Sequence, residues 1–461
     1  MAGTTRPIVR IAVIGAGSAG LAQIKQILDA FSRPGVEEQL ERVAFETRDD
    51  VGGLWNYDDA PKPFASVIIG DTLHTYPQKD DDPTPLYEGL QLMAYRDHTF
   101  PDGTNPIPTS AQITDYLHTY ATRFGLRPYI RFRTRVERLR RGSSRRWRTD
   151  SRGPAGAVSE EYDYVSISNG HYSDPWVPSM SGISSFPGRL IHSREFRRAS
   201  DFAGQTVLVV GSFSSGSDMS RLLGSLNIRG IPTKVYQSST GIGNSSTADD
   251  PNEPWRPYIN KVPLIDRFEA DGAKGRIHFK SIPFIHEPID DVDVVIFATG
   301  YYNPLPFCKK EDEPWRSTRL LEEEITIKDG GDERDLGGMR GLHVEGLDEM
   351  LLFLADDRSL AFPGLPYQIV PFPFAEVQSR LVALIWAGLV DMPPGHTPPV
   401  NAANRFVSLA SGQSVDADGP IRYSVKSRKV FIFPNPYEWD YTEDIFALLR
   451  EVDKGEEVPQ Y

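Results

Sequence analysis

The stretch IAVIGAGSAG, at residues 11–20, decides the fold of this chain. Its four apolar residues are typical of a buried strand, and they run into Gly15, Gly17 and Gly20 at the spacing of the G-x-G-x-x-G turn. In that turn the first glycine permits a tight bend, the second lets a pyrophosphate approach the backbone, and the third lets the next helix pack closely. A segment with helical periodicity, LAQIKQILDAF, follows directly. Its N-terminus is expected to offer free N–H groups to phosphate.

A second predicted strand, at residues 42–45, ends in Glu46. An acidic residue at this place usually accepts the ribose hydroxyls of a dinucleotide. The strand, turn, helix and strand together favour a dinucleotide site over a glycine-rich turn that binds nothing. Downstream, Gly53 allows close backbone approach, and Leu54 and Trp55 add apolar surface that suits a flavin or its pyrophosphate. The alternative for this second segment is a turn followed by a core tryptophan.

Length and composition narrow the class of protein. A chain of 461 residues suggests two or three domains, or one large fold with an inserted domain. The net charge of −13 argues against nucleic-acid binding and against docking on anionic lipid. The single cysteine, Cys308, excludes an internal disulfide, and no His or Cys pattern has metal-ligand spacing. Without a signal-peptide core or a long apolar run, we expect a cytoplasmic protein with no membrane contact and no metal.

The middle of the first half mixes irregular and regular segments. Residues 58–110 are rich in Pro, Asp and Gly, and such long irregular structure usually lines a site. Apolar residues at helical spacing then predict a helix, with Ser110 as its N-cap. Residues 129–168 are predicted to form short strands, and Val136 lies where a strand could place backbone atoms near an adenine. The Gly- and Pro-rich stretch at 169–178 predicts a domain junction.

A second glycine turn follows in the sequence GSFSSGSD, at residues 211–218. An apolar strand precedes it, Gly211 and Gly216 bound it, and a helix is expected to begin near Ser217. Phe213 replaces the middle glycine, so a pyrophosphate passes less closely there. The pattern favours a second dinucleotide site over a strand–helix unit kept only for packing.

The sequence leaves the nucleotide preference of this second site open. A 2′-phosphate usually has Arg or Lys after the second strand, whereas residues 238–240 are Ser-Ser-Thr. These hydroxyls can donate hydrogen bonds without charge assistance, and Lys234 or Arg221 are the candidates to supply charge. Farther on, the buried strand VVIFA and the following Thr299 are expected to close a parallel sheet and return the chain to the first domain.

The order of segments is distinctive: GAGSAG, GGLW, FPGRLIHSREF, GSFSSGSD and ATGY. The third matches F-x-G-x-x-x-H-x-x-x-[F/Y] through Phe186, Gly188, His192 and Phe196. This is the identifying motif of flavin-dependent N- and S-oxygenating enzymes. Over most of its length the chain resembles the flavin-containing monooxygenase family, and its second turn looks most like that of fungal and plant members.

The resemblance implies an α/β fold with two nested Rossmann-like dinucleotide-binding domains. An FAD domain takes residues 1–174 and 291–461, the latter with C-terminal helices, and an NADPH domain is inserted at residues 175–290. The predicted FAD contacts are Gly15, Gly17, Ser18, Ala19, Gly20, Glu46, Gly53, Leu54, Trp55 and Val136. The predicted contacts of the second site, with its return strand, are Ser215, Gly216, Ser217, Asp218 and Thr299.

The resemblance also implies the reaction. NADPH reduces FAD, O₂ adds to give a C4a-hydroperoxide, and one oxygen atom passes to a soft nitrogen or sulfur nucleophile of a small molecule. The flavin carries this chemistry while the protein supplies a dry, oriented pocket. No acid–base triad is needed, so no catalytic residue is assigned, and His192 is expected to be structural. The substrate and the oligomeric state are not predicted.

One segment departs from the family pattern. Members usually carry Thr-Asn-x-Pro between a Tyr-x-x-Leu segment and Met-x-Tyr/Phe-x-Asp, and that Asn faces the flavin peroxide. Here YEGLQLMAYRD, at residues 87–97, runs straight through, and Tyr76 is a poor substitute for the Asn. A flavin-dependent oxidase or oxidoreductase on the same fold therefore stays open. So does a non-catalytic FAD-binding protein, because fold alone does not establish function.

Overall fold

A computed structural model describes most of the chain as two compact units. The described residues are 7–56, 66–69, 72–75, 93–104, 108–239, 253–271, 274–280, 286–318, 320–321, 338–342, 344–348, 350–355, 357–367, 369–392 and 437–450. The first unit comprises Met1–Asn56, Glu88–Ser173 and Tyr302–Tyr461. The second comprises Tyr57–Tyr87 and Asp174–Tyr301. The chain therefore enters and leaves the second unit from within the first.

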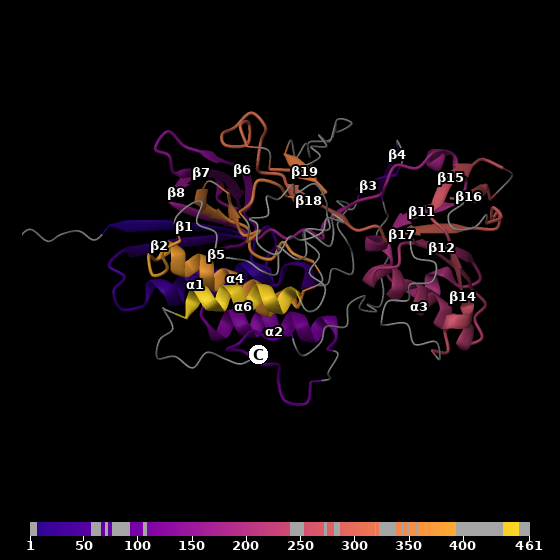
Figure 1. Cartoon of the computed structure of the whole chain (residues 1–461), viewed down its shortest axis with the longest axis horizontal. Coiled ribbons are helices and arrows are strands. Elements are labelled where there is room, and N and C mark those ends of the chain that lie inside the picture. The colour runs from indigo at the N-terminus through magenta and orange to yellow at the C-terminus, as the bar shows by residue number, and fades with distance from the viewer. Residues whose placement is uncertain are drawn as a thin grey trace, which may run out of the picture. The chain divides into compact units, whose positions relative to one another are not determined.

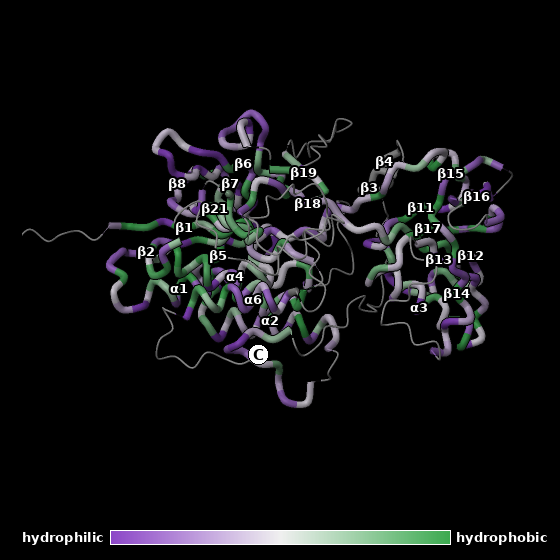
Figure 2. Tube along the Cα trace, viewed as in Figure 1, coloured by the Kyte–Doolittle hydropathy of each residue, from purple (hydrophilic) through white to green (hydrophobic). Residues whose placement is uncertain are grey.

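The first unit is organised around a largely parallel sheet. Its order is β20-β21-β9-β1-β2-β5, and only β20 runs antiparallel to its neighbour. The strand bounds are β1 (Ile8–Ile14), β2 (Gln39–Phe45), β5 (Ile130–Arg131), β9 (Tyr164–Ile167), β20 (Phe353–Leu354) and β21 (Asp357–Ala361). The C-terminal half of β1 is fully apolar and buried because a parallel sheet is covered on both faces (Figure 2).

Helices cover one side of this sheet (Figure 1). Helix α4 (Pro371–Trp386) packs along α1 (Ser18–Phe31), and α6 (Tyr437–Leu449) packs on α4. Two segments far apart in sequence are joined here, since the Gln23 side-chain amide donates a hydrogen bond of 3.4 Å to the Ser379 carbonyl. A further helix among the described residues, α2 (Ser110–Arg123), is close to the predicted one.

The cap of α2 differs from the sequence prediction. Thr109, not Ser110, is the N-cap residue, and its hydroxyl accepts the Gln112 N–H while the Gln112 side chain accepts the Thr109 N–H. This reciprocal capping box satisfies two N–H groups that a helix start leaves without partners. It also provides a helix with a capped N-terminus for comparison with α1.

The strands predicted over residues 129–168 are present. They form an antiparallel meander of β6 (Arg135–Arg141), β7 (Trp147–Gly153) and β8 (Gly156–Tyr162). A further antiparallel pair in this unit joins β18 (Tyr301–Leu305) to β19 (Met339–Gly341) through residues 303–305.

The second unit contains a five-stranded, fully parallel sheet. Its order is β11-β17-β12-β13-β14. The bounds are β11 (Arg189–His192), β12 (Thr206–Val210), β13 (Lys234–Ser238), β14 (Ile259–Val262) and β17 (Val294–Phe297). The other strands are β3 (Ser66–Ile69), β4 (Thr72–Thr75), β10 (Asp174–Pro175), β15 (Ile265–Glu269) and β16 (Arg276–Phe279), with β3–β4 and β15–β16 as antiparallel pairs.

Side chains of the central strand, β12, point alternately to the two faces of the sheet and so contribute to two apolar clusters. Leu208 and Val210 of β12 face one apolar cluster, whereas Val207 and Val209 face the other. Helix α3 (Ser214–Ile228) covers the second face, where Met219 and Leu223 are fully buried. A strand with period-2 side chains buried on both sides is expected in a parallel sheet between helical or loop layers.

Strand β17 corrects the predicted domain boundary. It pairs with both β11 and β12, so it lies inside the second sheet rather than returning to the first. The second unit therefore extends to Tyr301, beyond the predicted end at residue 290. Its two ends are tied together, because the Trp176 N–H donates to the Gly300 carbonyl at 2.9 Å and the Thr299 hydroxyl donates to the Trp176 carbonyl.

Candidate functional site

Two glycines of the first turn are required by backbone contacts. Gly15 has a φ of +104°, and a Cβ added there would lie 2.4 Å from the Ser168 carbonyl oxygen at the end of β9. A Cβ on Gly20 would lie 2.0 Å from the Gly15 carbonyl oxygen. Both distances are far inside van der Waals contact. The predicted roles of the first and third glycines, a tight bend and close helix packing, are therefore seen directly.

Gly17 is different, because the protein leaves space beside it. The nearest atom to a Cβ added there is the Gly53 Cα at 3.5 Å, an ordinary contact. The Gly52 N–H donates to the Ala16 carbonyl at 3.0 Å, and this bond holds the GGLW segment against the turn. The sequence pattern named both segments, and the structure brings them together. The absence of side chains at both positions lets the two backbones approach closely, since a Cβ on Gly53 would lie 2.9 Å from the Gly17 Cα.

The two apolar residues after Gly53 have different surroundings. The Leu54 side chain is 56% exposed, so it is available to a ligand. Trp55 is half-buried and packs edge-to-face on Phe372 of α4, with ring centroids 5.8 Å apart. Trp55 thus combines the two roles that the sequence left open, partial burial in the core and a place beside the turn.

The N-terminus of α1 has no capping side chain. Its N-cap residue is Gly17, no side chain accepts a hydrogen bond from the first turn, and that turn contains no acidic residue. This contrasts with the reciprocal cap of α2. Uncapped N–H groups and the positive end of the helix dipole favour an anion such as phosphate.

Glu46 lies beside this turn and is buried. One of its carboxylate oxygens accepts the Ala16 N–H at 2.8 Å and the other accepts the Arg48 N–H at 2.9 Å. The carboxylate therefore fixes the turn, and its predicted contact with ribose hydroxyls stays a prediction. Val136 is buried in β6, two residues beyond Thr134, whose N–H donates to the Glu46 carbonyl at 2.8 Å.

An aromatic cluster supports the turn, and sequence reasoning missed it. The Tyr95 hydroxyl donates to the Ser18 carbonyl at 2.7 Å, the Tyr95 N–H donates to the Tyr116 hydroxyl at 2.6 Å, and Tyr116 donates to the His98 carbonyl at 2.5 Å. Burial raises the pKa of Tyr95 and Tyr116, so both hydroxyls stay protonated donors. The loop at Gly364 completes the surroundings, since a Cβ there would lie 3.3 Å from the Ala19 Cβ.

The second turn repeats the glycine geometry of the first. Gly211 has a φ of +116°, and its added Cβ would lie 2.4 Å from the Ala298 carbonyl oxygen. A Cβ on Gly216 would lie 2.3 Å from the Gly211 carbonyl oxygen. The N-cap residue of α3 is Phe213, whose side chain is 55% exposed, and no side chain caps this helix either.

Helix α3 begins at Ser214, one turn earlier than the sequence predicted. Ser215 and Gly216 therefore lie in its first turn, and the Ser217 hydroxyl donates to the Ser212 carbonyl at 2.8 Å. Asp218 is 3.8 Å from the Arg221 guanidinium.

The identifying motif serves packing in the second unit. A Cβ on Gly188 would lie 2.5 Å from the Phe186 ring, and Phe196 stacks on Phe202 at 5.3 Å. The His192 ring is fully buried, receives the Arg194 N–H on Nδ1 at 3.2 Å and lies 3.0 Å from the Gly300 carbonyl through Nε2. Burial lowers the pKa of His192 to about 3. A neutral imidazole with both nitrogens engaged supports the predicted structural role.

The remaining predictions concern Cys308, the family's Asn segment and membrane-spanning helices. Cys308 is fully buried, and burial raises the pKa of its thiol, which fits a packed residue. Tyr76, Thr240 and residues 87–92, where the family's Asn segment would fall, lie outside the described residues. Within the described part of the chain, no helix is long and apolar enough to cross a membrane.

Comparison with known proteins identifies the family. A family model described as flavin-binding monooxygenase-like matches residues 8–231. The flavin-containing monooxygenase FMO GS-OX-like 2 of Arabidopsis thaliana is 30% identical over 403 residues, which cover 83% of this chain and 75% of the relative. The chain belongs to the flavin-containing monooxygenase family. It is therefore a flavin-dependent monooxygenase with FAD and NADPH as cofactors, which confirms the resemblance drawn from the motifs.

Other relatives of this monooxygenase extend the comparison. Flavin-containing monooxygenase 5 of Rattus norvegicus is 29% identical over 375 residues, covering 69% of this chain and 65% of the rat protein. The solved structure of S-allyl-L-cysteine S-oxygenase from Allium sativum matches with a TM-score of 0.68 and 22% identity, covering 96% and 88% of the two chains. This structural match confirms the predicted α/β fold with two Rossmann-type units. A small-molecule substrate and O₂ fit a monooxygenase.

Proposed function

We propose that this monooxygenase transfers one oxygen atom of O₂ to a soft nitrogen or sulfur nucleophile of a small molecule, through the C4a-hydroperoxyflavin that the motif resemblance implies. In this proposal the first glycine turn binds FAD and the second binds NADPH. The observation that carries it is the pair of uncapped helix N-termini, each at a glycine turn after a parallel strand.

The residues of the first turn fit FAD. The protein leaves room at Gly17, where a pyrophosphate needs to approach the backbone, while Gly15 and Gly20 are closed by backbone contacts. The first turn of α1 would hold the phosphates through its N–H groups. Glu46 holds the turn in place by accepting the Ala16 N–H. Leu54, which directly follows Gly53, offers exposed apolar surface.

The residues of the second turn fit a second dinucleotide. Gly211 and Gly216 meet the same backbone restrictions as their counterparts, and α3 presents an uncapped N-terminus without an acidic residue in its first turn. In place of a small residue, the middle position carries the exposed Phe213, which leaves the approach to the backbone narrower. We assign NADPH to this turn and FAD to the first.

The flavin would supply the redox chemistry, accepting a hydride from NADPH and activating O₂. The chain's own residues bind and orient the cofactors and limit water. No described residue needs to remove a proton from a soft nucleophile, whose lone pair reacts directly. His192 supports this view. It is neutral, each of its ring nitrogens has a hydrogen-bond partner, and an imidazole with a pKa of about 3 is a poor proton donor or acceptor at neutral pH.

The choice of nitrogen or sulfur over a carbonyl substrate is supported by the motif at Phe186, Gly188, His192 and Phe196. The name of the garlic neighbour gives S-oxygenation for that protein, which has 22% identity to this chain. The cytoplasmic location stays a prediction.

A rapid-mixing experiment tests this function. The purified protein is reduced with NADPH under argon and mixed with O₂, and flavin absorbance is followed together with H₂O₂ release. A transient absorbing species that decays faster when a sulfide or amine is added supports the proposal, as does ¹⁸O from ¹⁸O₂ in the product. Immediate return to oxidised flavin with stoichiometric peroxide would instead indicate an oxidase.

A further inference from the structure

His171 is a buried histidine to which the proposed reaction gives no role. It is 5% exposed, and its Nε2 atom has no hydrogen-bond partner among the residues that the structure describes. Burial lowers the pKa of His171 to about 4, so the imidazole is neutral at neutral pH and carries one N–H donor and one acceptor nitrogen. A buried polar atom without a partner costs free energy unless a ligand binds it.

The sheet order places His171 next to the first glycine turn. Strand β9 lies between β1 and β21, and the three strands are parallel, so the segments that follow them meet at one edge of the sheet. The glycine turn follows β1, residues 168–171 follow β9, and residues 362–367 follow β21. A dinucleotide binds along this edge of a Rossmann sheet, outside the carboxyl ends of the strands.

Contacts on both sides of His171 agree with this order. On one side, a Cβ added at Gly15 would lie 3.2 Å from the Cα of Asn169, two residues before the histidine. On the other side, the His171 ring packs on Tyr367 with ring centroids 4.6 Å apart. The loop of Tyr367 also reaches the first turn of α1, which a Cβ added at Gly364 would approach to 3.3 Å. His171 is thus flanked by two segments that contact the glycine turn or its helix.

The strand order also indicates which half of FAD would lie near His171. On the other side of β1 is β2, which is followed by Glu46, the residue expected beside the adenosine ribose. The pyrophosphate is assigned to the turn after β1. Since an extended dinucleotide continues in one direction, its ribityl–flavin half would cross the ends of β9 and β21, where His171 and Tyr367 lie.

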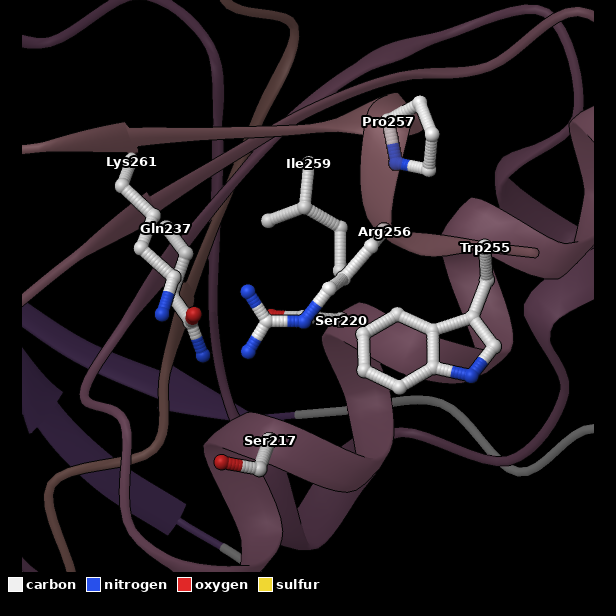
Figure 3. A pocket seen from close by; sticks show the side chains of 8 residues that line it. All are labelled: Ser217, Ser220, Gln237, Trp255, Arg256, Pro257, Ile259 and Lys261. Carbon is white, nitrogen blue, oxygen red and sulfur yellow. The ribbon is translucent and has the colours of Figure 1, made fainter. Parts of the chain in front are cut away.

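A buried polar atom without a described partner also lies beside the second glycine turn. Ser220 of α3 is 1% exposed, and its hydroxyl has no partner in the described part of the chain. With Ser217 from the first turn of the same helix, it lines a pocket of about 360 Å³ (Figure 3). Ser220 belongs to the site already proposed for NADPH. In each unit, therefore, a polar atom that the described protein leaves unpaired lies next to a turn assigned to a cofactor.

We propose that His171 binds FAD, with its Nε2 atom hydrogen-bonded to a polar atom of the ribityl–flavin half. The inference rests on the proposed assignment of FAD to the first turn. Neither the glycine turn nor the motif at residues 186–196 includes this histidine. Two effects of opposite kind follow: loss of the imidazole weakens FAD binding, yet it does not destabilise the FAD-free protein, in which the nitrogen is unpaired.

FAD binding and unfolding of the FAD-free, full-length protein test the proposal. For His171→Leu, we expect FAD affinity in a fluorescence titration to fall about tenfold, as for one hydrogen bond lost to a ligand in a buried site. The free energy of unfolding of the FAD-free protein should stay unchanged or rise, because Leu removes an unpaired buried nitrogen. His171→Gln, whose amide can replace Nε2 as donor or acceptor, should keep FAD affinity within about threefold of wild type.

Competition between ADP and FAD locates the contact along the cofactor. ADP carries the adenosine and the pyrophosphate but no ribityl or flavin group, so its affinity should change by less than about twofold in His171→Leu. An equal loss of affinity for ADP and FAD would overturn the placement of His171 at the flavin half.

His192→Leu is the matched control, because His192 is buried in the second unit and both its ring nitrogens have partners. This control should lower the free energy of unfolding and leave FAD affinity unchanged. A loss of stability in FAD-free His171→Leu, or unchanged FAD affinity, would show that His171 serves packing and would overturn the proposal. If the wild-type protein does not bind FAD, or ADP does not displace it, the assignment of the first turn itself fails, which is a distinct result.

Discussion

The two glycine turns are built on the same backbone plan. In each, the first glycine N–H donates at 2.8 Å to the carbonyl that ends the neighbouring strand, Phe45 for Gly15 and Ser238 for Gly211. In each, the first glycine also faces a carbonyl at 2.4 Å from its added Cβ. These shared distances show which parts of the motif the fold itself demands.

The turns differ where a ligand would lie. The first is covered by a second segment, with Gly53 against Gly17, whereas the second has no glycine at its middle position and exposes the Phe213 ring. The residues that fix them differ as well: the Glu46 carboxylate accepts an N–H of the first turn, and the Gln237 amide faces carbonyls of the second. A covered site suits a group that stays bound, and an exposed one suits a coenzyme that exchanges.

The third glycine of each turn should give the largest effect. Gly20→Ala would place a Cβ 2.0 Å from a backbone oxygen, and Gly216→Ala would place one at 2.3 Å. We expect each to lower the free energy of unfolding of its own unit by about 3 kcal/mol. Gly20→Ala should lose FAD, whereas Gly216→Ala should keep FAD and lose reduction by NADPH. Flavin content and denaturant unfolding measure both, and FAD loss in Gly216→Ala would contradict the division of roles.

Gly17→Ala separates the fold from the ligand. An added Cβ there is 3.5 Å from its nearest protein atom, so the free energy of unfolding of the FAD-free protein should change by less than about 1 kcal/mol. FAD affinity should fall about tenfold or more, since the methyl group enters the path of the pyrophosphate. Fluorescence titration of the FAD-free protein with FAD measures it. Unchanged FAD affinity would refute the assigned cofactor site.

Glu46→Gln examines what fixes the first turn. Both carboxylate oxygens accept backbone N–H groups, and an amide must turn its own NH₂ toward one of these donors. We expect a loss of about 1–2 kcal/mol in the free energy of unfolding, with weaker FAD retention. Glu41→Gln is a suitable control, because Glu41 pairs with Arg10 at the surface. An equal loss in both variants would indicate a general charge effect.

His192→Gln should have the smallest effect on turnover at neutral pH, because no proton transfer is assigned to this residue. The pKa of His192 is about 3 in the folded protein, against an ordinary value of 6.5, so below pH 6.5 the unfolded chain takes up a proton that the folded chain does not. The wild-type free energy of unfolding therefore falls with decreasing pH by up to roughly 1.4 kcal/mol per unit from this group. The variant should lack this contribution and keep its turnover. A changed pH profile of turnover with normal FAD content would point to proton transfer instead.

The strands, turns and helices around both glycine motifs could be predicted from the sequence, because apolar period and glycine spacing are local signals. Contacts between segments that are distant in the sequence could not be predicted in this way. Tyr95 supports the Ser18 carbonyl from 77 residues away, and its sequence surroundings give no sign of it. Strand β14 was not predicted, because the sequence around it is polar and Pro-rich. The hydroxyl of Ser238 looked available in sequence and is buried in the fold.

The hydrogen bond between Trp176 and Gly300 bears on how a domain can be inserted into another domain or exchanged between relatives. Since the Trp176 N–H donates to the Gly300 carbonyl at 2.9 Å, the entry and exit of the segment Asp174–Tyr301 are adjacent. A host domain can accept an insertion of this kind at one surface loop without separating its own strands. The same adjacency means that the segment Asp174–Tyr301 could be exchanged between relatives with two crossover points, whereas exchange of the whole second unit would also have to include Tyr57–Tyr87.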